Sequence, residues 1–133
     1  MAVVLDSDAV VGFLDRDDTV HDAADVAIRD LAGRYRLLVS AVTYAEVLTG
    51  ARLGHHDEVV VGGFFTELIS AILPVDAAVA DRAAEFRSRF RSLRMPDALI
   101  LASADTEPSV ELIVTGDQQM GRASCRERVY HPV

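Results

Sequence analysis

The feature that most constrains the fold is a repeated alternation of short apolar runs with helical patterns. In the segment His21–Ala32, for example, Ala24, Ala27, Ile28 and Leu31 share one helical face. This alternation predicts an α/β fold built on a parallel sheet. We expect strands over Ala2–Asp6, Leu37–Ser40, Ala71–Val75 and Val110–Thr115, and helices over Ala9–Leu14, His21–Ala32, Thr43–Leu53, Glu58–Ser70, Asp76–Phe90 and Pro96–Ala104.

Length and composition bound the class of protein. The chain has 133 residues, half of them apolar, which fits one globular domain with its own core. No apolar stretch approaches the roughly 18 residues that span a bilayer. Asp6 and Asp8 interrupt the first apolar run, so we expect no signal peptide and a cytoplasmic protein. The single cysteine, Cys125, excludes an internal disulfide and a thiolate zinc cage.

We expect a single domain over residues 1–133. Within it, the segment 118–133 has a different sequence pattern from the rest. It has no clear period, and Gly121–Val129 resembles a translated sequencing-adapter read-through. Two interpretations therefore stay open for 118–133: a native C-terminal edge, or an artefact at the 3′ end of the gene.

Four acidic residues lie where strands end or helices begin. Asp6 and Asp117 end the first and last apolar runs, Asp97 opens the helix predicted from Pro96, and Glu46 follows the second run. Carboxylates at the carboxyl ends of parallel strands point into the crevice where open α/β sheets bind ligands. Because converging carboxylates repel one another and are costly to bury unpaired, a divalent cation would stabilise them. The sequence predicts an acidic metal site.

Each of these acids also has an ordinary structural explanation. Asp6 fits a helix cap, and Glu46 fits a capping box begun by Thr43. Asp97 would favour the positive end of a helix dipole, and Asp117 fits simple turn chemistry. All four explanations would have to coincide at strand ends or helix starts, which favours a shared site.

The order of the acidic motifs resembles the PIN domain, and most closely the VapC-type toxins of bacterial toxin–antitoxin pairs. The motifs are Val4–Asp8, Ser40–Gly50, Asp97–Ala104 and Leu112–Asp117. None is specific alone, but four in the expected order cover nearly the whole chain. The resemblance implies a three-layer α/β/α sandwich with a short, mainly parallel central sheet. The segment after Asp117 departs from the family, which normally adds a final short strand there.

The resemblance also implies a chemistry. Asp6, Glu46, Asp97 and Asp117 would coordinate Mg²⁺ or Mn²⁺ for RNA cleavage. Hard cations prefer oxygen ligands, and a bound cation activates water and stabilises charge on the phosphate oxygens. Ser7 and Thr115 offer hydroxyls that could orient these ligands. Local turn hydrogen bonds are the alternative for both hydroxyls.

Four of the 13 arginines of this chain lie together just before Asp97. A formal charge of −8 argues against nucleic-acid binding, which depends on neutralising phosphates. A cluster of arginines could still contact an RNA backbone, or it could simply favour the carboxyl end of a helix dipole. The cluster comprises Arg87, Arg89, Arg91 and Arg94.

By the same resemblance, the partners are RNA, a cognate antitoxin and a second copy of the chain, with no membrane. Four apolar residues in two of the predicted helices could contact a partner or belong to the core: Val47, Leu48, Val59 and Phe64.

Two other functions stay open. Asp6–Val10 fits the nucleophile motif of haloacid-dehalogenase-like phosphatases, and Thr115–Asp117 resembles their later acidic loop. That chemistry normally uses a lysine, and this chain has none. A catalytically inactive PIN-like interaction module is the second alternative, which the presence of all four acids disfavours.

Overall fold

A single parallel sheet forms the centre of the protein. The computed structural model describes residues 1–116, 120 and 129–130. The strand order is β3-β2-β1-β4-β5, and every neighbouring pair is parallel. This confirms the predicted α/β class. The strands are β1 (Ala2–Leu5), β2 (Arg36–Ser40), β3 (Ile69–Leu73), β4 (Val110–Val114) and β5 (Val129–Tyr130).

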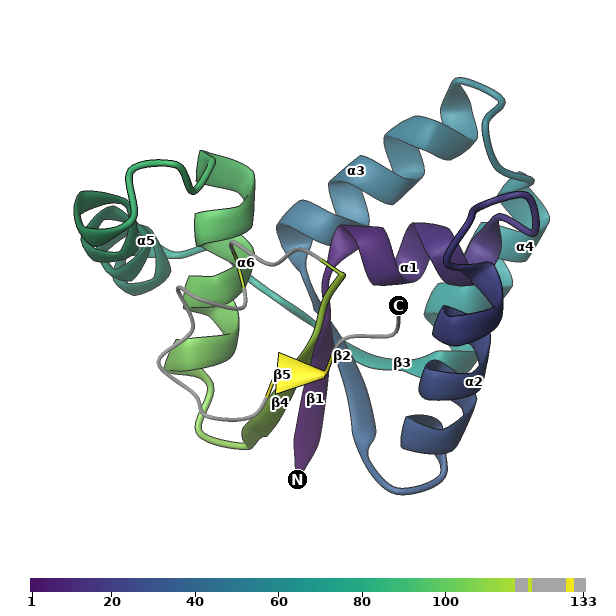
Figure 1. The fold of residues 1–133 in the computed structure, drawn as a ribbon, viewed down its shortest axis with the longest axis horizontal. Coiled ribbons are helices and arrows are strands. Elements are labelled where there is room, and N and C mark those ends of the chain that lie inside the picture. The colour runs from purple at the N-terminus through teal and green to yellow at the C-terminus, as the bar shows by residue number, and fades with distance from the viewer. Residues whose placement is uncertain (117–119, 121–128, 131–133) are drawn as a thin grey trace.

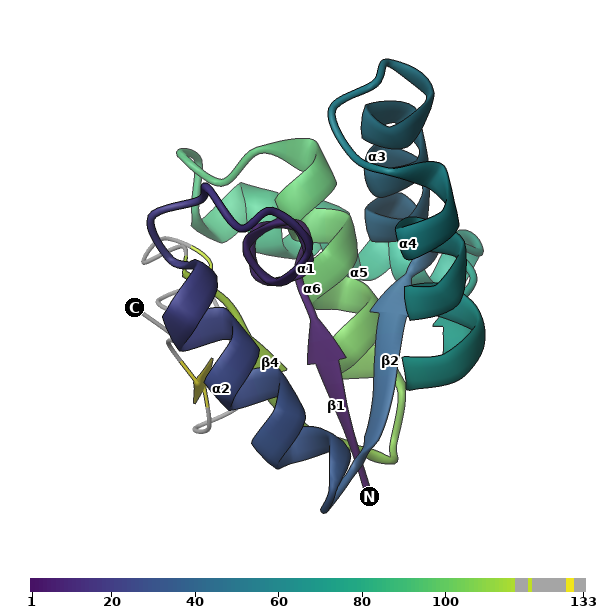
Figure 2. The same ribbon diagram turned by 90° about the vertical axis from the view of Figure 1, so that its right-hand side faces the viewer.

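Helices cover both faces of this sheet, as Figures 1 and 2 show. One face packs on α5 and α6, and the other packs on α1, α2, α3 and α4. The result is the three-layer α/β/α sandwich that the resemblance implied. The helices are α1 (Ser7–Leu14), α2 (His21–Ala32), α3 (Ala41–Arg52), α4 (Glu58–Gly63), α5 (Ala77–Arg89) and α6 (Met95–Thr106), with a π-helical turn η1 (Phe64–Leu68) after α4.

The central strand β1 divides the core into two layers. Its alternate residues point to opposite faces, so Val3 and Leu5 pack beneath α1 and α2, whereas Ala2 and Val4 pack beneath α5 and α6. All four residues are fully buried. An unbroken apolar run is therefore what a strand covered on both faces requires.

Two helices start directly at the end of a strand. Asp6 alone separates β1 from α1, which begins two residues earlier than predicted, and α3 follows β2 at once. Ser40 caps α3, because its Oγ accepts a hydrogen bond from Val42 N at 3.1 Å. These junctions bring the starts of α1 and α3 to the carboxyl edge of the sheet.

The predicted helix over Glu58–Ser70 is wrong in its second half. The α-helix ends at Gly63, the π-helical turn follows, and β3 covers Ile69–Leu73 instead of Ala71–Val75. Two adjacent glycines weaken the helix here. The wider turn lets Phe64 enter the core, and the Thr66 hydroxyl donates to the Gly62 carbonyl at 3.0 Å.

Phe86, on the buried face of α5, is the largest fully buried side chain among the described residues, so truncating it should be costly. It is 1% exposed, and the Arg82 guanidinium lies 4.4 Å from its ring centroid. Phe86→Ala should lower the free energy of unfolding by about 3–5 kcal/mol, because it leaves a cavity. Urea unfolding measures this loss.

The control for Phe86→Ala is Val26→Ala, since Val26 is exposed on α2. Its effect should stay within about 0.5 kcal/mol. Similar losses in the two variants would contradict the assignment of Phe86 to the core.

Candidate functional site

Asp6 lies at the carboxyl end of the central strand and is almost completely buried. Its exposed fraction is 2%, and its backbone N–H donates to Val114 O at 3.1 Å. Its Oδ1 accepts a hydrogen bond from Ala9 N at 2.8 Å, so Asp6 caps α1. The helix-cap interpretation of Asp6 is therefore confirmed. An aspartate that is almost completely buried is nevertheless unusual, since aspartates are rarely buried unless they are paired.

Burial raises the pKa of Asp6 to about 7. Hydrogen bonds from Thr115 and Ala9 oppose this rise in pKa, whereas the negative charges of Asp8 and Asp97 add to it. The carboxylate of Asp6 thus lacks a compensating positive charge within the described residues. A proton or a cation would supply that charge.

Asp97 approaches Asp6 from the other side of the sheet. It lies in the first turn of α6, and its side chain is 17% exposed. Because α6 leads back into the start of the parallel strand β4, the beginning of α6 lies at the carboxyl edge of the sheet. Arg94 Nη2 lies 3.6 Å from Asp97 Oδ2.

Glu46 is tied to α1 through a serine. Ser7 Oγ donates to Glu46 Oε1 at 2.6 Å, and Thr43 Oγ1 lies 3.2 Å from Ser7 Oγ. The capping box suggested for Glu46 is wrong, because α3 begins at Ala41 with Ser40 as its cap. Glu46 therefore faces the start of α1 and not the start of its own helix.

Thr43 is a site residue that the sequence analysis missed. It is fully buried and lies three residues before Glu46 on the same helix. Residues with this spacing are neighbours on a helix surface, and this signal could have paired Thr43 with Glu46.

The predicted set of four acids is only partly described by the structure. Asp117 lies outside the described residues. Thr115 is buried at the end of β4 and hydrogen-bonds to Asp6. Among the described side chains, no three His, Cys, Asp or Glu residues come close enough to hold a metal ion.

The donor chemistry at this edge fits a hard cation. Asp6, Asp97 and Glu46 offer carboxylate oxygens, which Mg²⁺ and Mn²⁺ prefer. A cation bound here would compensate the buried charge of Asp6 and lower its raised pKa, since it would replace the proton.

The arginine cluster does not act as one unit. Arg87 Nε donates to Leu93 O at 2.9 Å, which holds the loop after α5. Arg94 pairs loosely with Asp97. Arg89 and Arg91 are exposed. Part of the cluster is therefore structural, and Arg94 is the member next to the acids.

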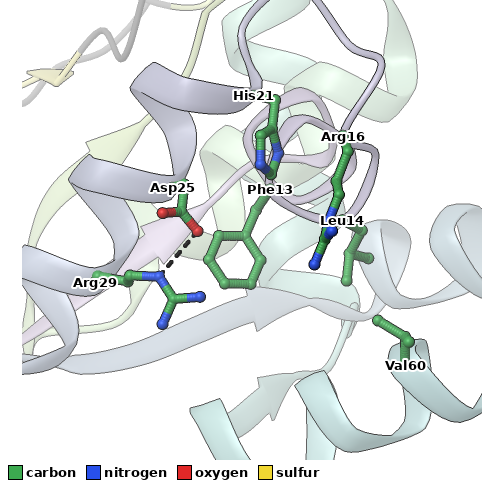
Figure 3. Close-up of a pocket in the computed structure, with 7 residues that line it drawn as sticks. All are labelled: Phe13, Leu14, Arg16, His21, Asp25, Arg29 and Val60. Carbon is green, nitrogen blue, oxygen red and sulfur yellow. Dashed lines mark hydrogen bonds and ion pairs between the residues drawn. The ribbon is translucent and has the colours of Figure 1, made fainter.

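A separate pocket of about 500 Å³ lies between α1, α2 and α4, and Figure 3 shows its lining. Arg29 pairs with Asp25 at 2.9 Å, and its guanidinium lies 5.6 Å from the ring centroid of Phe13. An apolar floor with charged groups around it suits a peptide segment better than a phosphate. The lining residues are Phe13, Leu14, Arg16, His21, Asp25, Arg29 and Val60.

None of the helices in the described part of the chain is both long enough and apolar enough to cross a membrane.

Comparison with solved structures shows the same fold in several bacterial proteins. FitAcB from Neisseria gonorrhoeae has 22% identity and a TM-score of 0.76, with 98% of this chain and 97% of that chain covered. VapBC2 from Rickettsia felis, bound to a DNA fragment from its promoter, has 18% identity and a TM-score of 0.77, with 98% of each chain covered.

VapC20 from Mycobacterium tuberculosis, a Sarcin-Ricin loop cleaving toxin, has 16% identity and a TM-score of 0.72, with 92% of this chain and 95% of that chain covered. No curated protein matches the sequence. The PIN domain family matches residues 3–124. A match over that much of the chain, on a sandwich with acids at the carboxyl edge of its sheet, shows that the chain belongs to the PIN domain family.

Proposed function

We propose that this protein is a metal-dependent ribonuclease that acts as the toxin of a toxin–antitoxin pair. The observation that carries the proposal is the buried carboxylate of Asp6, which lies close enough to Asp97 to be affected by its charge and has no positively charged side chain beside it among the described residues. A site with this surplus of negative charge can attract phosphate only when cations are bound. Membership of the PIN domain family supports nuclease chemistry.

Each residue at the carboxyl edge of the sheet has its own proposed role. Asp6 and Asp97 would hold Mg²⁺ or Mn²⁺, with Asp117 completing the set. When bound, such a cation would neutralise charge at the phosphate and make water more acidic. Thr115 orients Asp6 through its hydroxyl, and Ser7 orients Glu46.

In the reaction, the oxygen of a water molecule forms a bond to phosphorus, and the bond from phosphorus to a ribose oxygen breaks. The water proton passes to the carboxylate of Glu46, and the departing ribose oxygen takes a proton from solvent. Glu46 can accept this proton because it is exposed and already oriented by a short hydrogen bond.

The alternatives are weaker. A haloacid-dehalogenase-like phosphatase would need a lysine, which this chain lacks, and it belongs to another family. An inactive interaction module would not need a buried, poorly compensated carboxylate, which lowers stability at neutral pH.

Loss of either inner acid should abolish cleavage. Asp6→Asn and Asp97→Asn should each lower the rate of RNA degradation by about 100-fold or more, equivalent to about 2.7 kcal/mol, because both remove charge from the proposed metal site. Degradation of total tRNA and ribosomal RNA with Mn²⁺ measures this rate, and EDTA should stop it.

The matched control is Asp22→Asn, since Asp22 is exposed in the first turn of α2. It should cleave at the wild-type rate. Full activity of Asp6→Asn or Asp97→Asn would refute the assignment of the site.

The raised pKa of Asp6 predicts a pH-dependent stability. Unfolded Asp titrates near 3.9, and folded Asp6 titrates at about 7. The protonated state thus contributes stability that is fully present below about pH 4 and is lost as the pH rises to about 7. Asp6→Asn should be more stable than wild type at pH 7.5, by up to about 4 kcal/mol.

Urea unfolding of both proteins at pH 4.5 and 7.5 tests this prediction, because the two chains differ only at residue 6. Mn²⁺ should stabilise the wild type at pH 7.5, since it binds the folded state, and should stabilise Asp6→Asn less. Parallel pH profiles, or no response of the wild type to Mn²⁺, would contradict it.

A cognate antitoxin is the proposed protein partner. Similar structures include VapBC2 from Rickettsia felis and a toxin–antitoxin complex from Klebsiella pneumoniae. The contact residues considered from sequence need revision, because Val47 and Phe64 are buried in the core and Leu48 packs against it. Val59 is exposed and adjoins Val60, which lines the pocket between α1, α2 and α4. We propose that an apolar antitoxin segment docks there.

Placing a charged side chain in this pocket should weaken binding of the antitoxin. Val60 is 53% exposed, so Val60→Asp should fold normally and lose affinity for the antitoxin by at least about 10-fold, because it places a charge against apolar surface. Val26→Asp, on exposed α2 surface outside the pocket, is the control. Co-purification with the product of the adjacent small gene measures the effect; equal recovery of both variants would exclude this pocket.

A further inference from the structure

Arg94 is held only loosely by Asp97. It is the residue just before α6, and its side chain contributes no cap to that helix. Its side chain is 80% exposed, and its guanidinium lies 3.6 Å from Asp97 Oδ2. That separation is too long for a good hydrogen bond. Arg94 is attracted to Asp97 without being fixed to it.

Comparison with the other described ion pairs shows how loose this contact is. Arg34–Asp30 closes to 2.6 Å and Arg29–Asp25 to 2.9 Å, both within hydrogen-bond distance. At 3.6 Å, the Arg94–Asp97 pair is longer than these two pairs and longer than the pairs of Arg82 with Glu85 and Asp105. An exposed pair contributes little to stability even at good geometry. Breaking this one would therefore cost the protein very little.

Arg94 lies where a side chain that can leave its ion pair could contact RNA. Asp97 is close enough to Asp6 for its charge to raise the pKa of Asp6. Arg94 thus stands at the rim of the acidic cluster, at the carboxyl edge of the sheet. A phosphate that reaches Asp6 and Asp97 must come within reach of this guanidinium, which is long, exposed and able to fork onto two phosphate oxygens.

The neighbouring arginine is already engaged elsewhere. Arg87 Nε donates to Leu93 O and so fixes the backbone immediately before Arg94. This bond orients the loop from which Arg94 projects. The cluster thus contains one arginine that shapes the loop and one that the loop presents to the acids.

We propose that Arg94 leaves Asp97 when RNA binds and contacts the non-bridging oxygens of the phosphate that is cleaved. Charge on those oxygens increases in the transition state, so Arg94 would stabilise the transition state more than the bound substrate. The inference rests on the proposed nuclease function and adds a residue to it. Arg94 is then a catalytic residue and not one more contact of the RNA backbone.

The test compares Arg94→Ala, Arg94→Lys and Arg34→Ala with wild type. Arg34 is the matched control, because it too is exposed and paired with an aspartate, yet it precedes β2 at the opposite edge of the sheet. Single-turnover cleavage of total tRNA and ribosomal RNA is measured at saturating protein with Mn²⁺. Mn²⁺ binding by each variant is measured separately by calorimetry without RNA.

Arg94→Ala should lower the saturated rate by about 100-fold, the usual loss when one donor to a developing oxyanion is removed. Arg94→Lys should recover part of this loss, and Arg34→Ala should cleave like wild type. Mn²⁺ should bind Arg94→Ala as tightly as wild type or more tightly, since a competing cation has gone from Asp97.

Two results would overturn the role of Arg94. A saturated rate within about threefold of wild type would show that it does not act on the reacting phosphate. Weaker Mn²⁺ binding that accounts for the loss would show that it merely positions Asp97. A wild-type protein that cleaves nothing with Mn²⁺ would refute the proposed nuclease function itself, which is a different outcome.

Discussion

The burial of one carboxylate at the end of the central strand governs the rest of this structure. Asp6 ends β1, caps α1 and is enclosed by β4 through Thr115 and the Val114 carbonyl. Desolvation disfavours the ionised form of Asp6, and the negative charges of the neighbouring acids disfavour it further. A protein selected only for stability would place an uncharged cap here. An unfavourable charge at this position is consistent with the cation site proposed above.

Much of the fold was predictable because most segments show the hydrophobic pattern of only one kind of secondary structure. β1, β2 and β4 are short apolar runs at the centre of the sheet, and their observed bounds lie within about two residues of those predicted, as is usual for element ends. The region Glu58–Ser70 was not predictable in the same way. There an apolar sequence suits either a helix or a strand, and packing of Phe64 decides where one ends and the other begins.

The places of Asp6 and Asp97 in the fold were predictable, but the contacts around them were not. The strand end that places Asp6 and the helix start that places Asp97 could be read from sequence. The bond from Ser7 to Glu46 joins residues far apart in the chain, and local patterns assigned Glu46 to a capping box instead. Capping rules consider only neighbours in sequence, so they fail where tertiary contacts compete for the same carboxylate.

The direct junctions between strands and helices have a consequence for how such a protein can change over time. β1 passes into α1 through Asp6 alone, and β2 passes into α3 without a connecting residue. One inserted residue in either junction would turn the following helix by about 100° and carry its side chains away from the acids. The segment 53–57 between α3 and α4, by contrast, is an open surface connection that could lengthen without disturbing the sheet. Diversity in length should therefore accumulate at the far end of this helical pair, while the carboxyl edge keeps a fixed spacing.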